Sequence, residues 1–469
     1  MATTSKDVRV RFAPSPTGNL HIGGLRAAIF NWLFAKHNDG TFLIRIEDTD
    51  KERSTQEYVN SIIDALAWMQ IKSDEPLHIQ SEFEQKHREF LQKLIAENKA
   101  YKCFCSAEEL TQRLGDGTNV KYDLCCRDQA CDNNEKRPYV VRFKIPDNIE
   151  NVTFTDLIRG TITIARDQLD DFIIARSDGS PVYNFVVVID DAAMKINYVI
   201  RGEEHLGNTV KQILLYEALG LEQPAWAHLP LILNPEGGKL SKRDGAVSVV
   251  EYKKDGYLPD ALLNYLVRLG WSHGDQEVFT REELIKFFSL DAVGSSGAIF
   301  DIEKLDWLNG VYIRSMGADD LLSYIENELK EPLSTEFILW DRDRIILAIE
   351  VYKERAKTVR ELIDEIRLLY VGSTNYDADA LQKWNTSDTA AHITNLITQL
   401  ENLSNWDLDM VKDIITSYCK QAPIKLPMIL QPIRLALIGK TQSPSVFQLL
   451  CLLGKDVSLE RLRSFVSVL

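Results

Sequence analysis

Residues 14–24 read Pro-Ser-Pro-Thr-Gly-Asn-Leu-His-Ile-Gly-Gly and separate a short alternating pattern at 8–12 from a helical pattern at 25–36. This order predicts a strand, a tight loop and a helix. Backbone N–H groups and the positive dipole end at a helix start favour an anion, and glycines there let a phosphate approach the main chain. We therefore expect His21 to face phosphates. The alternative is that His21 only caps the helix while Gly23 and Gly24 allow close packing.

A basic turn follows in the middle of the chain. Residues 234–238 read Asn-Pro-Glu-Gly-Gly, and Lys239, Ser241 and Lys242 come directly after this turn signal. During nucleotidyl transfer, charge builds on the α-phosphate and on the departing pyrophosphate, and lysines on a mobile loop can stabilise it. An isolated basic turn is more often a solvated surface feature. The two stretches together predict chemistry on a nucleoside triphosphate.

Composition places the chain among ordinary globular proteins. The 469 residues, 45% of them hydrophobic, allow several domains, and no apolar run has membrane-spanning length. The first residues lack the apolar stretch of a secretory signal, so a cytoplasmic protein without a membrane partner is expected. The net charge of −15 opposes binding to RNA phosphates unless positive charge is concentrated locally.

Five of the seven cysteines lie between residues 103 and 131. Such crowding in a cytosolic protein favours a metal over a disulfide. Cys103 and Cys105 form a Cys-x-Cys pair and Cys126 follows, so thiolates from two knuckles can form a tetrahedral zinc site. Reduced thiols that fill a small core are the alternative.

The periodicity of the chain suggests how it is organised. Strands at 8–12 and 42–46 with helices at 25–36 and 58–69 form a βαβ pattern. Further strands are predicted at 185–189 and 198–200, followed by a helix at 209–219, so that the parallel sheet resumes after an insertion. The insertion contains the cysteines, a strand at 161–164 and a turn at 178–179. Helices are expected at 261–269 and 281–288, and helical periodicity dominates from about 320, as at 321–329, 345–352 and 410–418.

The two motifs resemble the HIGH and KMSKS signatures of class I aminoacyl-tRNA synthetases. Three longer strings are similar to the glutamyl branch: RFAPSPTG at 11–18, RIEDTD at 45–50 and VIRGEEH at 199–205. The resemblance continues through 258–266, 300–305 and 431–437 and so runs nearly end to end. Gly24 stands where the first signature has its second histidine, a difference that is common in glutamyl and glutaminyl members.

The resemblance implies a fold class and domain boundaries. It implies an α/β Rossmann-like nucleotide-binding domain at 1–82 and 183–235, with an inserted α+β acceptor-stem domain at 83–182 that holds the cysteine cluster. A mostly α-helical stem-contact domain with the KMSKS-like loop is expected at 236–320, and an all-α anticodon-binding domain at 321–469. The helical tail argues against the glutaminyl relative, which ends in β-barrels.

The activity implied by the resemblance is the attachment of L-glutamate to tRNA(Glu) in protein biosynthesis. ATP would activate glutamate as its adenylate, and the glutamyl group would pass to the 3′-terminal ribose. Such chemistry needs positioning and charge stabilisation rather than a nucleophilic residue. ATP is thus a substrate and Mg²⁺ its companion, with Zn²⁺ as the candidate structural ion. A monomer is the family expectation.

The glutamate pocket can be argued from charge. Glutamate brings two carboxylates and one ammonium group, so its pocket needs at least two cationic donors and one anionic acceptor. Arg11, Arg201 and Glu47 meet this need, although without the motifs the same charges fit solvated strand ends. By resemblance, the glutamate-binding residues are Arg11, Ala13 (through its backbone), Ser15, Glu47, Tyr183 and Arg201.

The resemblance assigns the remaining site residues. The catalytic residues are His21, Lys239, Ser241 and Lys242, and the ATP-binding residues are Pro14, Thr17, Gly18, His21, Gly23, Gly24, Glu204, His205 and Lys242. The metal ligands are Cys103, Cys105, Cys126 and Asp128, with Cys125 or Cys131 as a substitute. Arg355 stands where glutamyl enzymes that reject glutamine tRNA tend to carry arginine, which indicates an anticodon contact. A surface arginine without an RNA contact is the alternative.

Other functions fit the sequence less well. Arg201 and the helical tail disfavour a glutaminyl ligase, and the expected anticodon domain disfavours a shorter glutamyl-queuosine-type transferase. Another nucleotidyltransferase would not need the long tail. A degenerate paralogue that serves as an RNA-binding module would have eroded motifs, whereas His21, Lys239, Ser241 and Lys242 are all present.

Overall fold

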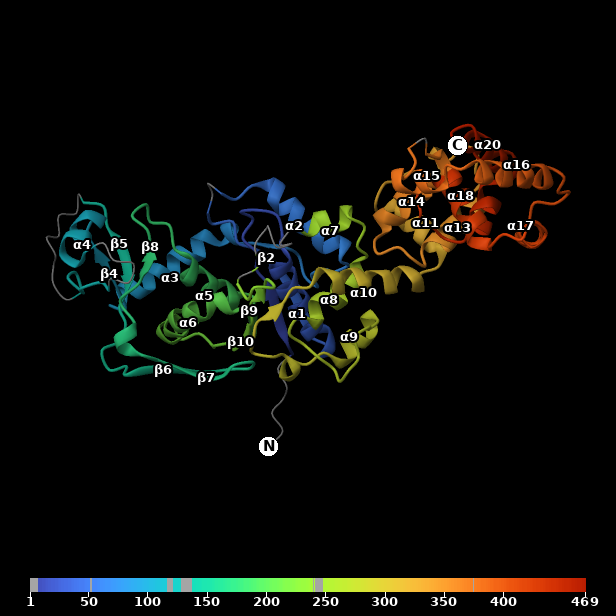
Figure 1. The fold of residues 1–469 in the computed structure, drawn as a ribbon. Helices are drawn as coiled ribbons and strands as arrows, with labels where there is room; N and C mark the ends of the chain where they lie inside the picture. The colour runs from blue at the N-terminus through green and yellow to red at the C-terminus, as the bar shows by residue number, and fades with distance from the viewer. Residues whose placement is uncertain are drawn as a thin grey trace. The chain divides into compact units, whose positions relative to one another are not determined.

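The structure is a computed structural model that describes residues 7–50, 53–115, 121–127, 137–238, 240, 248–373 and 375–469. The chain forms two compact units, Met1–Val250 with Leu262–Ile302 and Glu251–Ala261 with Glu303–Leu469. In Figure 1 the first unit runs from blue to yellow, and the second is mostly orange and red.

The start of the first unit is a small parallel sheet. Strands β1 (Arg9–Phe12), β2 (Thr41–Ile46) and β3 (His78–Ile79) pair in the order β1-β2-β3. Helix α1 (Ile22–His37) connects β1 to β2, and α2 (Gln56–Trp68) connects β2 to β3. The predicted βαβ pattern is therefore confirmed. Most of α1 is buried, so it shows no polar face.

A second sheet in this unit has the strand order β7-β6-β10-β9. Strand β9 (Tyr198–Gly202) is parallel to β10 (Ala225–Leu229), and α6 (Leu206–Leu219) connects them. Strands β6 (Asn151–Asp156) and β7 (Gly160–Ala165) form a hairpin (Figure 1), and β6 pairs in parallel with β10. A hairpin from the segment expected to be an insertion thus extends the same sheet as β9 and β10.

The two sheets meet where β1 and β9 lie close together. Asn197, just before β9, donates its N–H to the carbonyl oxygen of Arg9 at 3.1 Å, and its side-chain oxygen accepts from the Arg9 N–H at 2.8 Å. Strand pairing nevertheless leaves β1 and β9 in separate sheets. The expectation that one parallel sheet resumes after the insertion is therefore wrong in this detail.

The strand predicted at 185–189 is also wrong, because these residues belong to helix α5 (Tyr183–Ala193). The run Phe-Val-Val-Val-Ile has high β-propensity, but all five side chains are buried and α5 packs against α6 and α3 (Glu84–Ala96). A short apolar run cannot be assigned by periodicity when a helix is buried on every side. Tertiary packing has therefore overridden local propensity.

The rest of the first unit surrounds these sheets. Strands β4 (Ala100–Cys103), β5 (Val140–Phe143) and β8 (Ile173–Ala175) form an antiparallel sheet near α4 (Ala107–Leu114). The other elements up to residue 299 are β11 (Ile232–Leu233), α7 (Val249–Lys254), α8 (Pro259–Arg268), α9 (Arg281–Phe287) and β12 (Ala298–Ile299). The last residues of α7 and the first of α8 belong to the second unit. The helices predicted at 209–219, 261–269 and 281–288 and the strand at 161–164 are confirmed.

The regular elements of the second unit, within its described residues, are all helices. Its helices are α10 (Ile302–Ser315), α11 (Ala318–Asn327), α12 (Leu333–Glu336), α13 (Arg342–Tyr352), α14 (Val359–Val371), α15 (Ala378–Trp384), α16 (Ser387–Glu401), α17 (Leu408–Gln421), α18 (Leu426–Ile438), α19 (Val446–Leu453) and α20 (Lys455–Val466). One apolar core runs through them, from Leu258 to Phe465. The all-helical tail predicted from the periodicity is confirmed.

Within the described ranges, no helix is both long enough and apolar enough to cross a bilayer.

Candidate active site

The first unit contains a cavity of about 600 Å³ at the start of α1. Its wall is formed by the ends of β1 and β9, the first turn of α5 and residues 229–232. Thirteen of the predicted site residues line it: Arg11, Ala13, Pro14, Ser15, Gly18, His21, Gly23, Gly24, Glu47, Tyr183, Arg201, Glu204 and His205. Thr17 is not among the lining residues, and its N–H donates to the carbonyl oxygen of Ser15 at 2.9 Å.

His21 both caps α1 and lines the cavity. Its Nδ1 accepts a hydrogen bond from the N–H of Gly24 at 3.2 Å. A Cβ atom at Gly23 would lie 3.1 Å from the His21 ring, and one at Gly24 would lie 2.9 Å from Leu20 Cδ1. The glycines therefore give the ring its place at the helix start, and capping and cavity lining are compatible roles.

Described residues on both sides of 241–247 lie close to the start of α1 or to the cavity. Lys239, Ser241 and Lys242 lie outside the described residues, but Leu240 lines the cavity and donates its N–H to the carbonyl oxygen of Ile232 at 3.2 Å. On the far side of the turn, Ser248 forms an antiparallel bridge with His21. The chain therefore enters and leaves this segment beside the helix start.

Buried carboxylates hold Arg11 of β1 and Arg45 of β2. Arg11 Nε donates to Asp191 Oδ1 at 3.0 Å, and Arg45 donates to the same oxygen at 2.5 Å. Arg45 also donates to Glu47 Oε1 at 2.9 Å, although its own side chain is 0% exposed. Burial raises the pKa of Asp191, but Arg11 and Arg45 outweigh it, so the pKa lies below its usual range. Arg11 is thereby fixed at the cavity wall.

Arg201, on β9, is 6% exposed and has one unsatisfied nitrogen. Its Nη2 donates to Thr209 Oγ1 at 2.7 Å, and its Nε donates to His228 Nε2 at 3.3 Å. Its Nη1 is buried and has no hydrogen-bond partner among the described residues. Burial lowers the pKa of Arg201. Because a buried donor without an acceptor is costly, an anionic group in the cavity would relieve it.

Other polar groups around the cavity are also shifted by burial. Burial raises the pKa of Glu47, against the opposing effect of Arg45, and it raises that of Tyr183. Burial and then the charge of Arg201 lower the pKa of His205 to about 4, so this ring is neutral near pH 7. The cavity is thus lined by three arginines, two glutamates and a helix N-terminus. Such a set can bind a zwitterionic acid beside a phosphate.

Sequence reasoning missed several residues that complete this site. Asp191 pairs with Arg11 from α5, which was misassigned as a strand. Arg26, on α1, lines the cavity and donates to the carbonyl oxygens of Leu269, at 2.9 Å, and Pro230. Burial lowers the pKa of Arg26 to about 10. An arginine inside an apolar helical run is the signal that could have drawn attention to it.

Three of the predicted metal ligands come together. The Sγ atoms of Cys103, Cys105 and Cys126 lie within 4.8 Å of one another, with Cys105 and Cys126 3.5 Å apart. Burial raises the pKa of Cys105 to about 12, so without a cation the Cys105 side chain stays a thiol. Cys125 is exposed and lies outside the group, whereas Asp128 and Cys131 are not in the described part of the chain. The three thiols suit zinc as a donor set.

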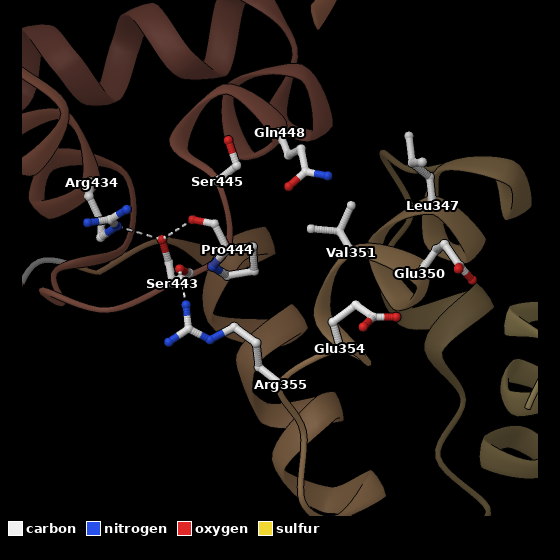
Figure 2. Close-up of a pocket in the computed structure, with 10 residues that line it drawn as sticks. All are labelled: Leu347, Glu350, Val351, Glu354, Arg355, Arg434, Ser443, Pro444, Ser445 and Gln448. Carbon is white, nitrogen blue, oxygen red and sulfur yellow. Dashed lines mark hydrogen bonds between the residues drawn. The ribbon is translucent and has the colours of Figure 1, made fainter. Parts of the chain in front are cut away.

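The second unit contains a separate pocket of about 480 Å³ (Figure 2). Arg355 lines it and donates to the carbonyl oxygen of Ser443 at 2.6 Å. Arg434 donates to the Ser443 hydroxyl at 2.8 Å, and burial, then the charge of Arg355, lowers the pKa of Arg434. Glu350 and Glu354, from the same segment as Arg355, also line this pocket. Arg355 is therefore part of a polar pocket rather than an isolated surface residue.

Comparisons with known proteins agree with the division of the chain into two units. The family described as tRNA synthetases class I (E and Q), catalytic domain, matches residues 7–307, and an anticodon binding domain matches residues 320–466. The glutamate–tRNA ligase of Thermodesulfovibrio yellowstonii is 43% identical over 98% of this chain and 99% of its own length. Glutamate–tRNA ligase 2 of Coxiella burnetii is 43% identical over 97% of each chain.

Solved structures give the same result. A glutamate tRNA ligase from Elizabethkingia meningosepticum, crystallised in complex with its amino acid, superimposes with a TM-score of 0.88 at 33% identity. The alignment covers 99% of this chain and all of the other. The glutamate–tRNA synthetase of Elizabethkingia anophelis gives a TM-score of 0.86 at 32% identity over 98% of this chain and 100% of its own.

The fold and the catalytic-domain match therefore place this protein among the class I aminoacyl-tRNA synthetases, in the branch that handles glutamate and glutamine. Within that branch the chain belongs to the glutamate–tRNA ligase family, since relatives 43% identical align with it over almost their whole length.

Proposed function

We propose that this protein attaches L-glutamate to tRNA(Glu) in two steps, as its family membership indicates. In the first step an oxygen of the glutamate α-carboxylate attacks the α-phosphorus of ATP, and pyrophosphate leaves. In the second step a hydroxyl of the 3′-terminal ribose attacks the carbonyl carbon of the adenylate, and AMP leaves. The product serves protein biosynthesis.

The observation that carries the choice of amino acid is the unsatisfied Nη1 of Arg201. It is buried in the wall of the same cavity as Arg11. Two cations that both face one cavity suit a substrate with two carboxylates, and glutamine would offer an amide to one of them. We assign the carboxylates of glutamate to Arg11 and Arg201. Ala13 (through its backbone), Ser15, Glu47 and Tyr183 bind the rest of the substrate.

ATP occupies the part of the cavity at the start of α1. The helix dipole and its N–H groups favour phosphates, and the neutral His205 adds no charge. Pro14, Thr17, Gly18, His21, Gly23, Gly24, Glu204, His205 and Lys242 form this ATP site. We assign stabilisation of the α-phosphate and the leaving pyrophosphate to His21, Lys239, Ser241 and Lys242, because Leu240 lines the cavity and Ser248 forms a bridge with His21.

Two metal ions belong to the proposal. Mg²⁺ would enter with the ATP polyphosphate and reduce the negative charge on it. Zn²⁺ would be held by Cys103, Cys105 and Cys126, with Asp128 or Cys131 as the fourth ligand, and would fix the local fold. Elemental analysis of the purified protein tests this second assignment, since less than stoichiometric zinc would remove it.

The tRNA would contact both units. We assign residues 83–182 to the acceptor stem, 236–320 to the inner stem and 321–469 to the anticodon. Arg355 would donate to the edge of an unstacked anticodon base, because guanidinium groups recognise single-stranded bases in this way. We expect a monomer that acts in the cytoplasm, where its substrates are present.

An aminoacylation assay tests the function as a whole. Purified protein with ATP, Mg²⁺ and tRNA(Glu) should transfer labelled glutamate and should not transfer labelled glutamine. ATP–pyrophosphate exchange with and without tRNA separates activation from transfer. Charging of glutamine in preference to glutamate would favour the glutaminyl alternative, and RNA binding without charging would favour a degenerate paralogue.

A further inference from the structure

The substrate-facing arginine Arg201 is held by a chain of buried polar groups that no motif reveals. His228, on β10, is 0% exposed and lies between Arg201 and Asp156 at the end of β6. Its Nε2 faces Arg201 Nε at 3.3 Å and Thr209 Oγ1 at 2.9 Å, while its Nδ1 lies 2.6 Å from Asp156 Oδ2. These groups link the glutamate pocket to the β6–β7 hairpin.

The guanidinium group fixes the direction of this chain. Arginine has only donors, so the His228 nitrogen that faces Arg201 must be an acceptor and carries no proton. The proton of the neutral ring is therefore on Nδ1. This N–H donates a hydrogen bond to the Asp156 carboxylate. Burial lowers the pKa of His228, which also favours the neutral ring.

Asp156 is held as a carboxylate by several donors. Its Oδ1 accepts the N–H groups of Ile158 and Arg159 at 3.0 and 2.9 Å, in addition to the His228 bond at Oδ2. Although burial raises the pKa of Asp156, these hydrogen bonds bring it below the usual range. The register places Asp156 beside Trp226 of β10, so the hairpin cannot slide without moving the carboxylate.

We propose that Asp156 and His228 are positioning residues for glutamate recognition: Asp156 sets the His228 tautomer, and His228 with Thr209 aims Arg201 Nη1 at the substrate carboxylate. With Nε and Nη2 both held, the guanidinium plane is fixed and Nη1 is the donor left for the ligand. This inference rests on the proposed function, because it needs glutamate in the cavity.

The decisive variant is Asp156→Asn, which keeps the shape but presents an amide to His228. An Asp-to-Asn change next to a histidine can leave the geometry intact and set the wrong tautomer. An Nε2–H would then face Arg201 and repel its guanidinium. In charging assays with saturating tRNA(Glu), we expect the KM for glutamate to rise at least about tenfold, equivalent to about 1.4 kcal/mol. The KM for ATP should change less than about twofold, since Arg201 is assigned to a glutamate carboxylate and not to the phosphates.

Two substitutions of His228 provide the rescue test. The side-chain amide of His228→Gln has an NH₂ donor group and a carbonyl acceptor and can serve both neighbours, whereas His228→Leu has neither. We expect His228→Gln to keep a glutamate KM well below that of His228→Leu. Thr153→Val, on the same strand as Asp156, is the matched control, because it removes an exposed bond to Thr163 on the hairpin.

The outcomes separate this proposal from a purely structural role and from failure of the proposed function. If kcat fell, the KM values for glutamate and ATP rose together and Tm was lowered, Asp156 would be only an anchor of the hairpin. An unchanged glutamate KM in Asp156→Asn would also overturn the proposal while leaving the function intact. If that variant does not fold, Thr209→Val decides, with a selective rise in glutamate KM supporting the proposal and an unchanged KM rejecting it. A wild-type protein that charges no glutamate would overturn both.

Discussion

The cavity at the start of α1 and the pocket beside Arg355 both use arginine, but they hold it differently. In the first, Arg11 is buried and bonded to the Asp191 carboxylate, and Arg201 is buried against a histidine and a hydroxyl. In the second, Arg355 is exposed and its guanidinium donates to a backbone carbonyl. The first arrangement aims a charge before the ligand arrives, and the second leaves it in contact with water.

The difference matches the two ligands expected. A small charged substrate must be recognised inside a low-dielectric site. There, a misplaced guanidinium contributes little binding free energy, and a preorganised one contributes much more. A base in an RNA loop binds at a wet surface, where charges are screened and each contact contributes less. Substitutions in the first pocket should therefore have larger effects than equivalent ones in the second.

The largest effect is expected for Arg201→Ala. Removing this guanidinium leaves a substrate carboxylate buried without a partner, which costs about 3–5 kcal/mol, or about 10²–10⁴-fold in kcat/KM for glutamate. Steady-state charging assays measure it, and Arg342→Ala, on the surface of the second unit, controls for loss of a positive charge. Near-normal charging by Arg201→Ala would refute the assignment and erase the contrast between the two pockets.

A smaller but still large effect is expected for Asp191→Asn. Arg11 and Arg45 share Asp191 Oδ1, so this change weakens two buried ion pairs together. We expect kcat/KM for glutamate to fall about 10–100-fold and stability to fall by about 3 kcal/mol. Charging kinetics and denaturant unfolding measure the two effects. If neither changed, the cavity would not depend on its buried counterion.

Gly23→Ala tests the nucleotide side of the same cavity. The added Cβ would lie 3.1 Å from the His21 ring and would displace it slightly. We expect the KM for ATP to rise about fivefold to tenfold, which is a cost of about 1 kcal/mol. The KM for glutamate should stay within twofold. A matching rise in both values would mean that the helix start supports the whole site rather than the nucleotide alone.

The smallest effect is expected for Arg355→Gln in the second unit. Losing one exposed guanidinium contact should lower kcat/KM for tRNA(Glu) about threefold to tenfold, or about 1 kcal/mol. The KM for glutamate should not change. Lys357→Gln, which removes a positive charge two residues away and outside the pocket, is the matched control. Efficient charging of tRNA(Gln) by the wild-type protein would remove the discriminating role of Arg355.

Much of this site could be predicted because its ligand-facing residues lie in local motifs. His21, Gly23 and Gly24 are close in sequence, and Arg11, Glu47 and Arg201 follow from the charges of the substrate. The residues behind them could not be found in this way. Asp191 bonds to Arg11 across 180 positions, and Asp156 to His228 across 72. No local pattern encodes such pairs.

The misassigned α5 explains part of this gap. Its valines favour a strand, and a strand at 185–189 gave no reason to place Asp191 beside the arginines. One signal was present, because Arg45 interrupts the apolar run of β2 and a buried charge needs a partner. Only the tertiary fold shows that this partner comes from α5.

The β6–β7 hairpin has a consequence for anyone who would trim this enzyme to a minimal core. Residues 83–182 look removable as a cassette, but excision would take the last residue of β6 with it and leave a buried imidazole N–H on β10 facing nothing. A shortened version would need to keep 151–165 joined to the sheet by a new linker. The point at which the chain can be cut therefore lies within the apparent insertion rather than at its ends.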